Sequence, residues 1–142
     1  MTDKWGRRFF ISGAVALLIV GLVHSLSFFE KQVPANDTER QLLDLMANYR
    51  LNLMGSMRSM NNLLRGFSIS FMLAALVMGA VDLVVCRERE SLLKRVALVN
   101  TIWLAAMTVV SLHYFFVMPT SFLVVALLIF ALAWLKLSGS AT

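Results

Sequence analysis

The chain has 142 residues and a net charge of +5; 59% of its residues are hydrophobic and only 15% are charged. Soluble domains contain roughly 45–50% apolar and about 25% charged residues, so this composition excludes an ordinary water-soluble protein. The only cysteine, Cys86, excludes an intramolecular disulfide and a cysteine-rich metal site. We expect residues 1–142 to form a single membrane domain.

Four apolar stretches have the length of membrane-spanning helices: residues 9–29, 66–86, 96–116 and 119–137. Each is close to the roughly 20 residues that cross a bilayer core as a helix. Hydrocarbon offers no hydrogen-bond partners, so a single apolar segment must satisfy its backbone groups internally, as a helix does. The sequence therefore predicts an all-α fold, a four-helix transmembrane bundle.

The first stretch has one alternative interpretation, because basic residues precede it as they do in a signal peptide. It is, however, longer than the 7–15 residues of a signal-peptide apolar region, and no convincing cleavage site follows it. We therefore predict that it stays in the protein as the first span.

Basic residues next to the spans predict the orientation of the chain in the membrane. Positively charged segments resist translocation, so both termini and the loop at residues 87–95 are expected in the cytoplasm, an N-in and C-in topology. The same charges fit lipid headgroups and give no reason to expect nucleic acid as a partner. The eight residues are Lys4, Arg7, Arg8, Arg87, Arg89, Lys94, Arg95 and Lys136.

The connector between the first two spans predicts an additional outward-facing amphipathic helix over about residues 37–64. Residues 36–38 offer a helix N-cap just after Pro34. Apolar residues then recur at steps of three and four, the spacing of one helical face. Whether this helix is continuous with the second span is left open by the pattern. The apolar positions are Leu42, Met46, Tyr49, Leu53, Met57, Met60 and Leu64.

Arg50, Arg58 and Arg65 follow one border of that apolar face when the connector is drawn as a helix. One interpretation is that they contact lipid headgroups at the membrane interface. The other is that Arg50 and Arg58, two turns apart, bind an anionic ligand through charge-assisted hydrogen bonds.

His24 and His113 fall at similar depth in the outer halves of the first and third spans. Two histidines on different helices are the ligand set of bis-histidine haem b, and an imidazole also hydrogen-bonds a quinone carbonyl. The alternative is that each histidine only hydrogen-bonds a neighbouring helix. A zinc site needs three or four ligands, so no metal site is predicted here.

Asp82 is the only carboxylate within a span, and it shares a face with the small residues Ala75 and Gly79. Small residues let helices approach closely in membranes. Asp82 lies one turn from the cytoplasmic end of the second span, so we predict an intramembrane ion pair with a basic residue there.

Three segments carry a resemblance to known proteins: NYRLNLMGSMRS at 48–59, GLVH at 21–24 and HYFF at 113–116. With them, the chain resembles a family of small uncharacterised bacterial four-span membrane proteins. More distantly, its layout is similar to DoxX-like proteins, with four spans and a histidine late in the first. The resemblance implies a four-helix fold in a bacterial inner membrane. The DoxX-like layout implies only a loose link to quinone-dependent redox systems.

No motif in the sequence indicates catalytic residues. We predict an integral membrane protein that acts as a binding, assembly or accessory subunit and contacts the bilayer and other membrane subunits through the 37–64 helix. The alternative is a redox-linked protein that holds haem b or quinone between His24 and His113.

Overall fold

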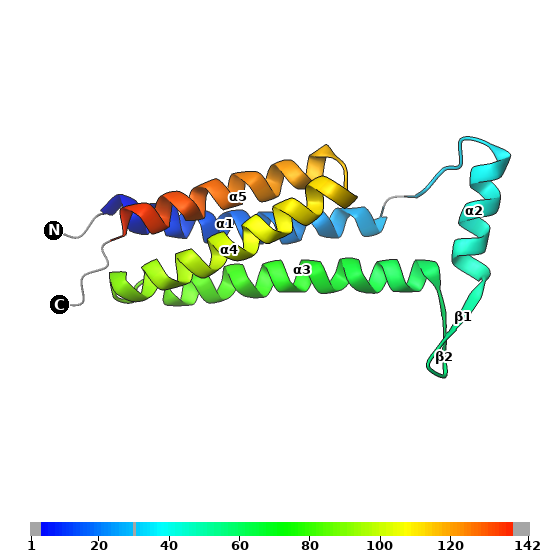
Figure 1. Cartoon of the computed structure of the whole chain (residues 1–142), viewed down its shortest axis with the longest axis horizontal. Helices are drawn as coiled ribbons and strands as arrows, with labels where there is room; N and C mark the ends of the chain where they lie inside the picture. The colour runs from blue at the N-terminus through cyan, green and yellow to red at the C-terminus, as the bar shows by residue number, and fades with distance from the viewer. Residues whose placement is uncertain (1–3, 30, 138–142) are drawn as a thin grey trace.

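The computed structural model describes residues 4–29 and 31–137, and most of them are helical (Figure 1). The elements in chain order are α1 (Lys4–Leu26), a 3-10 turn η1 (Ser27–Phe29), α2 (Asp37–Asn48), β1 (Arg50–Leu53), β2 (Ser56–Ser59), α3 (Met60–Val85), α4 (Glu90–Tyr114) and α5 (Val117–Lys136). Helices α1, α3, α4 and α5 are long and apolar enough to cross a membrane. These helices overlap the four predicted spans, and α1, α3 and α4 begin earlier than predicted, at Lys4, Met60 and Glu90.

The four long helices run side by side, with α1 between α3 and α5 and with α4 packed mainly on α5 (Figure 1). Both ends of the described chain lie at the same end of this unit as the turn between α3 and α4. We call this the basic end. At the opposite end, the hairpin end, α2 and the two strands project and run across the direction of the long helices.

Small residues allow a close approach of α1 and α3. A Cβ atom added at Gly79 would lie only 2.8 Å from the backbone oxygen of Ala14. A Cβ atom at Gly21 would lie 2.8 Å from the side chain of Leu76. Glycine at these positions lets the two helix backbones come into contact. Lipid tails are as apolar as the side chains, so van der Waals packing between the helices, rather than the hydrophobic effect, stabilises this contact.

Aromatic packing joins α1 to α5 nearer the basic end. Phe10 and Phe130 are fully buried and meet edge to face, with ring centroids 5.8 Å apart. Gly13 leaves room for the Phe130 ring, since a Cβ atom there would lie 2.8 Å from it. Leu17 and Leu104 are also fully buried, so the core is continuous from α1 through α5 to α4.

The predicted helix over residues 37–64 is wrong beyond Asn48. Helix α2 begins as predicted, with the Asn36 side chain accepting a hydrogen bond from the backbone N–H of Glu39 at 2.8 Å. The chain then forms an antiparallel hairpin, in which Leu53 pairs with Ser56. A second cap restarts the helix, because the buried Ser59 side chain accepts from the N–H of Asn62.

The turn of the hairpin gives the physical reason for this correction. Met54 and Gly55 both have positive φ, 50° and 89°, which is the geometry of a two-residue hairpin turn. The Asn52 side chain accepts a hydrogen bond from the Gly55 N–H at 2.9 Å and holds the turn closed. Two successive residues with positive φ are incompatible with a right-handed helix, so helical spacing across this segment carries no structural meaning.

Candidate functional site

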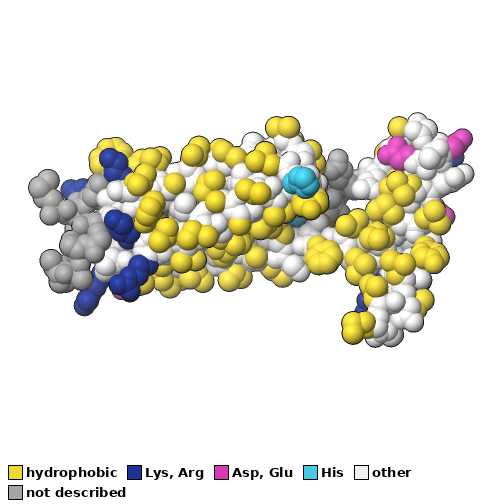
Figure 2. Space-filling view, viewed as in Figure 1, with side chains coloured by type: hydrophobic (Ala, Val, Ile, Leu, Met, Phe, Trp, Pro, Cys, Tyr) yellow, Lys and Arg dark blue, Asp and Glu magenta, His cyan; other side chains and the backbone are white. Residues whose placement is uncertain are grey.

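The charges of the molecule are separated along its length. Figure 2 shows the Lys and Arg side chains gathered near the basic end, and the acidic side chains mainly over α2. The side chains of α2 include Asp37, Glu39 and Asp44, and Arg40 pairs with Asp37 at 3.4 Å. The surface between the two ends is predominantly hydrophobic in this view, as expected for helices surrounded by lipid.

Arg7 ties α1 to the end of α3 at the basic end. Its guanidinium donates hydrogen bonds to the backbone oxygens of Cys86 and of Glu88, the latter at 2.9 Å. The last carbonyl groups of a helix have no partner within the helix, and a cation near them is favourable. Arg7 therefore caps the turn between α3 and α4.

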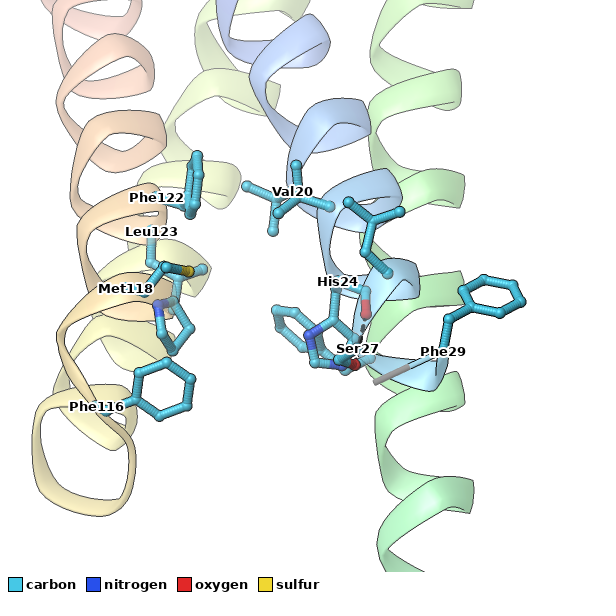
Figure 3. A pocket seen from close by; sticks show the side chains of 12 residues that line it. Val20, His24, Ser27, Phe29, Phe116, Met118, Phe122 and Leu123 are labelled. Atoms are coloured by element: carbon cyan, nitrogen blue, oxygen red, sulfur yellow. Dashed lines mark hydrogen bonds between the residues drawn. The ribbon is translucent and has the colours of Figure 1, made fainter. Parts of the chain in front are cut away.

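An apolar cavity of about 520 Å³ lies near the hairpin end, between α1 with η1 on one side and α5 on the other (Figure 3). Figure 3 shows Val20 and His24 on the α1 side facing Met118 and Phe122 of α5. The other lining residues are Val23, Leu26, Ser27, Phe29, Phe71, Phe116, Pro119 and Leu123. Their chemistry makes the cavity suitable for an apolar ligand.

His24 is the one titratable residue among the twelve that line this cavity. Its Nε2 atom is buried and has no hydrogen-bond partner among the described residues. The ring lies against α3: it is edge-on to Phe71, with centroids 5.0 Å apart, and the backbone of Ser68 interacts with the imidazole. The hydroxyl of Ser27 donates to the backbone oxygen of His24 at 2.7 Å, so it is already engaged and does not serve the ring (Figure 3).

His113 lies apart from this cavity. Its side chain is exposed at the end of α4, where its ring meets that of Tyr114 edge-on at 4.7 Å. It is not among the twelve residues that line the cavity. The structure thus brings only one of the two predicted histidines to the cavity wall.

Asp82 is buried, but its partner differs from the predicted one. The amide of Asn100 on α4 donates a hydrogen bond to the Asp82 carboxylate at 2.7 Å. Within the described residues the recorded ion pair is Arg40–Asp37, so the predicted intramembrane ion pair of Asp82 is not formed. Arg87, Arg89 and Arg95 at this end are exposed, so their charges stay solvated, and the amide satisfies the carboxylate without burying a second charge.

The predicted arginine stripe is not formed either. Arg50 lies in β1 opposite Ser59, and Arg58 lies in β2 opposite Leu51. Directly paired residues share a face of a strand pair and neighbours along a strand alternate, so Arg50 and Arg58 belong to opposite faces. Arg65 lies on α3, outside the hairpin. Arg50 and Arg58 therefore do not lie two helical turns apart on one face, which was the geometry expected of a two-arginine anion site.

The sequence analysis missed the α5 wall of the cavity, made by Phe116, Met118 and Phe122 among others. These residues carry no chemical signature, because apolar side chains in a span are expected to face lipid. Their position follows only from the packing of α5 on α1. Among the described residues, no group of three or more His, Cys, Asp or Glu side chains could hold a metal ion.

The fold and the cavity define the chain as a multi-pass helical membrane protein. No protein-family model matches it, and no match was found among curated proteins or among solved structures. The resemblance to bacterial four-span proteins stays a prediction.

Proposed function

We propose that this chain is a non-enzymatic binding, assembly or accessory subunit of a bacterial inner membrane, with α2 and the hairpin as its contact surface. The supporting observation is the apolar character of that surface. Leu45, Tyr49 and Met54 are 60%, 63% and 106% exposed. They lie outside the four long helices, so exposure to the lipid around those helices does not explain them. Exposed apolar groups of this kind are typical of interaction sites.

The charge separation supports an N-in, C-in orientation for this subunit. Lys and Arg side chains gather at the end that holds both ends of the described chain, while acidic side chains lie mainly over α2. By the positive-inside rule the basic end faces the cytoplasm, and the hairpin end faces the opposite compartment. The contact surface is then available to the outward parts of other membrane proteins.

Flexible methionines suit a surface that adapts to a partner. Met54 is at the turn of the hairpin, and Met57 in β2 is 51% exposed. Thioether side chains fill irregular gaps and tolerate different neighbours. Arg50 and Arg58, on opposite faces of the strand pair, place a cation beside each face for a partner's carboxylates.

Site-specific photo-crosslinking tests this function. A photoreactive residue at Met54 should form a protein adduct of one discrete mass in intact membranes, and Met57→Asp should reduce its yield strongly. The matched control is the same photoreactive residue at Val125, an exposed position in the middle of α5, which should label lipid only. Labelling of lipid alone from Met54 as well would refute the contact surface.

The redox-linked alternative is favoured by one observation, the imidazole of His24 in the lining of an apolar cavity. Haem b held by His24 and His113 fits the arrangement poorly, since His113 is exposed and does not line that cavity. A quinone fits better, because a single imidazole suffices to hydrogen-bond one carbonyl oxygen. Absorbance of protein purified after expression with haem precursor separates the two, since only haem gives a Soret band.

A further inference from the structure

Three of the four long helices have exposed apolar residues in line with an exposed cation at the basic end. The cation is Arg8 on α1, Arg95 on α4 and Lys136 on α5. Residues three, four or seven positions apart lie on one face of a helix, so each cation and the apolar residues in line with it form one outward-facing stripe. The apolar residues are Val15 and Ile19 on α1, Val99 and Ile102 on α4, and Leu132 and Val125 on α5.

The stripes on α1 and α5 match one leaflet of a bilayer in length. Ile19 and Val125 are each eleven residues from the cation of their stripe. That separation is about 16 Å along a helix, and one leaflet of a hydrocarbon core is about 15 Å thick. Each of these stripes therefore presents a cation near the level of the lipid phosphates, followed by an apolar surface about as long as one lipid chain.

The three cations have no carboxylate partner among the described residues. The ion pair recorded there is Arg40–Asp37, which lies on α2 at the hairpin end. Figure 2 shows the Lys and Arg side chains gathered near the basic end. The acidic residues of the α3–α4 turn and the start of α4 are Glu88 and Glu90, too few to balance the cations at this end. An excess of one charge confined to one end of a molecule attracts ions of the opposite sign.

A ligand of this surface must match a cation and an apolar stripe together. A soluble phosphate or a nucleic acid would match only the charge, whereas a phospholipid has its phosphate next to its hydrocarbon chains. Trp5 supports the depth of this site, because the guanidinium carbon of Arg8 lies over its ring, 5.2 Å from the centroid. Tryptophan is enriched where the hydrocarbon core meets the headgroups.

We propose that the basic end binds anionic phospholipids of the adjoining leaflet, with the phosphate on Arg8, Arg95 or Lys136 and a hydrocarbon chain along the stripe next to it. This site lies at the end opposite α2 and the hairpin and does not depend on that contact surface. At the hairpin end the same helices carry no lysine or arginine, either in the last turns of α1 and α4 or in the first turn of α5. The binding is therefore confined to one leaflet.

Quenching of Trp5 fluorescence by lipids with brominated chains tests the proposal on the full chain in vesicles. Trp103→Phe and Trp134→Phe leave Trp5 as the only tryptophan. At equal mole fractions, brominated phosphatidylglycerol should occupy the position next to Trp5 about fivefold more often than brominated phosphatidylcholine, the gain expected from one cation near the lipid surface. Arg8→Gln should remove this preference and Arg8→Lys should keep it. Arg8 is exposed, so both variants leave the packing of the helices intact.

The matched control is Arg40→Gln, which removes the same charge at the hairpin end, where Arg40 pairs with Asp37. It should leave the preference at Trp5 unchanged. Equal quenching by the two lipids would overturn the proposal, as would a preference that persists in Arg8→Gln. A loss of preference in Arg40→Gln as large as in Arg8→Gln would also overturn it, because the cause would then be the net charge of the chain.

A second reporter repeats the test on α4. Val99→Trp, with the three native tryptophans replaced by phenylalanine, places a single fluorophore at an exposed position one turn from Arg95. The same preference for brominated phosphatidylglycerol is expected there, and Arg95→Gln should remove it while Arg8→Gln should not. Equal effects of the two substitutions at this reporter would contradict separate binding at each stripe.

Discussion

The two ends of the four long helices are built differently. Toward the basic end the helices are in close contact: Arg7 caps the α3–α4 turn, the Phe130 ring fills the space over Gly13, and Gly79 meets the backbone of Ala14. Toward the hairpin end α1 and α5 are separated by a cavity, and a buried imidazole nitrogen lacks a partner.

This difference separates the residues that fix the fold from those available for binding. Close packing without voids gives a single well-defined arrangement. Cavities and buried unsatisfied polar atoms cost stability and contribute nothing to the close packing of the helices. The comparison predicts that substitutions near the basic end act on stability, whereas substitutions around the cavity act on ligand binding.

The largest effect on stability is expected from Gly79→Ala. The new Cβ atom would lie 2.8 Å from the Ala14 oxygen, so α1 and α3 must move apart. Overpacking of this kind costs about 1–3 kcal/mol. The matched control is Gly66→Ala on the same helix, where a Cβ atom meets nothing within 4 Å. Thermal unfolding in detergent should show a lower midpoint for Gly79→Ala only, and equal midpoints would contradict the close helix contact.

Asn100→Leu should have the next largest effect, because it leaves the buried Asp82 carboxylate without its amide donor. We expect a loss of about 1–2 kcal/mol, as for other interhelical hydrogen bonds in membranes. The double variant Asp82→Leu with Asn100→Leu should recover part of that loss, since it removes both polar groups. The double-mutant cycle compares the free energy of unfolding of the two single variants and the double variant, measured with denaturant. If the loss in the double variant equals the sum of the two single losses, the two side chains do not interact.

Arg7→Ala should cost about 1 kcal/mol, since two backbone oxygens of the turn between α3 and α4 lose a charged donor. The control is Arg87→Ala, which removes an exposed charge from the same turn. Hydrogen exchange should become faster at residues 86–92 in the Arg7 variant and stay unchanged in the control. Faster exchange in the Arg87 variant, with no change in the Arg7 variant, would contradict the cap by Arg7.

The smallest effect on the whole molecule is expected from Gly55→Ala. At φ +89° an alanine is strained, which opens the hairpin locally by about 1 kcal/mol. The four long helices do not depend on this turn, so the unfolding midpoint should remain unchanged. Ser56→Ala, at the neighbouring position, should leave the hairpin protected from hydrogen exchange. A large drop in the unfolding midpoint for Gly55→Ala would show that the hairpin supports the long helices.

The sequence predicted the four long helices well, because length and hydrophobicity suffice when lipid is the solvent. It failed in the connector, where apolar residues at helical spacing coincided with a hairpin. The signal that distinguishes the two is Met54-Gly55 after Asn52, since glycine and a preceding asparagine favour a tight turn.

At the candidate site the sequence identified His24 but not its surroundings. The histidine stood out because a polar group within a span is rare. Its pairing with His113 could not be judged, since equal depth on two helices says nothing about the direction in which each side chain points. The partner of Asp82 was missed for a similar reason. The sequence analysis considered only charged partners, whereas the donor in the structure is the neutral amide of Asn100.

One labelling experiment tests the central claim, which is that the basic end and the hairpin end lie on opposite sides of a membrane. In a Cys86→Ala background, single cysteines replace the exposed Ser56 of the hairpin or the exposed Glu88 of the α3–α4 turn. A membrane-impermeant maleimide should label Ser56→Cys in intact bacterial cells with a permeable outer membrane, and Glu88→Cys only after the inner membrane is opened. Labelling of both cysteines from the same side would contradict the account.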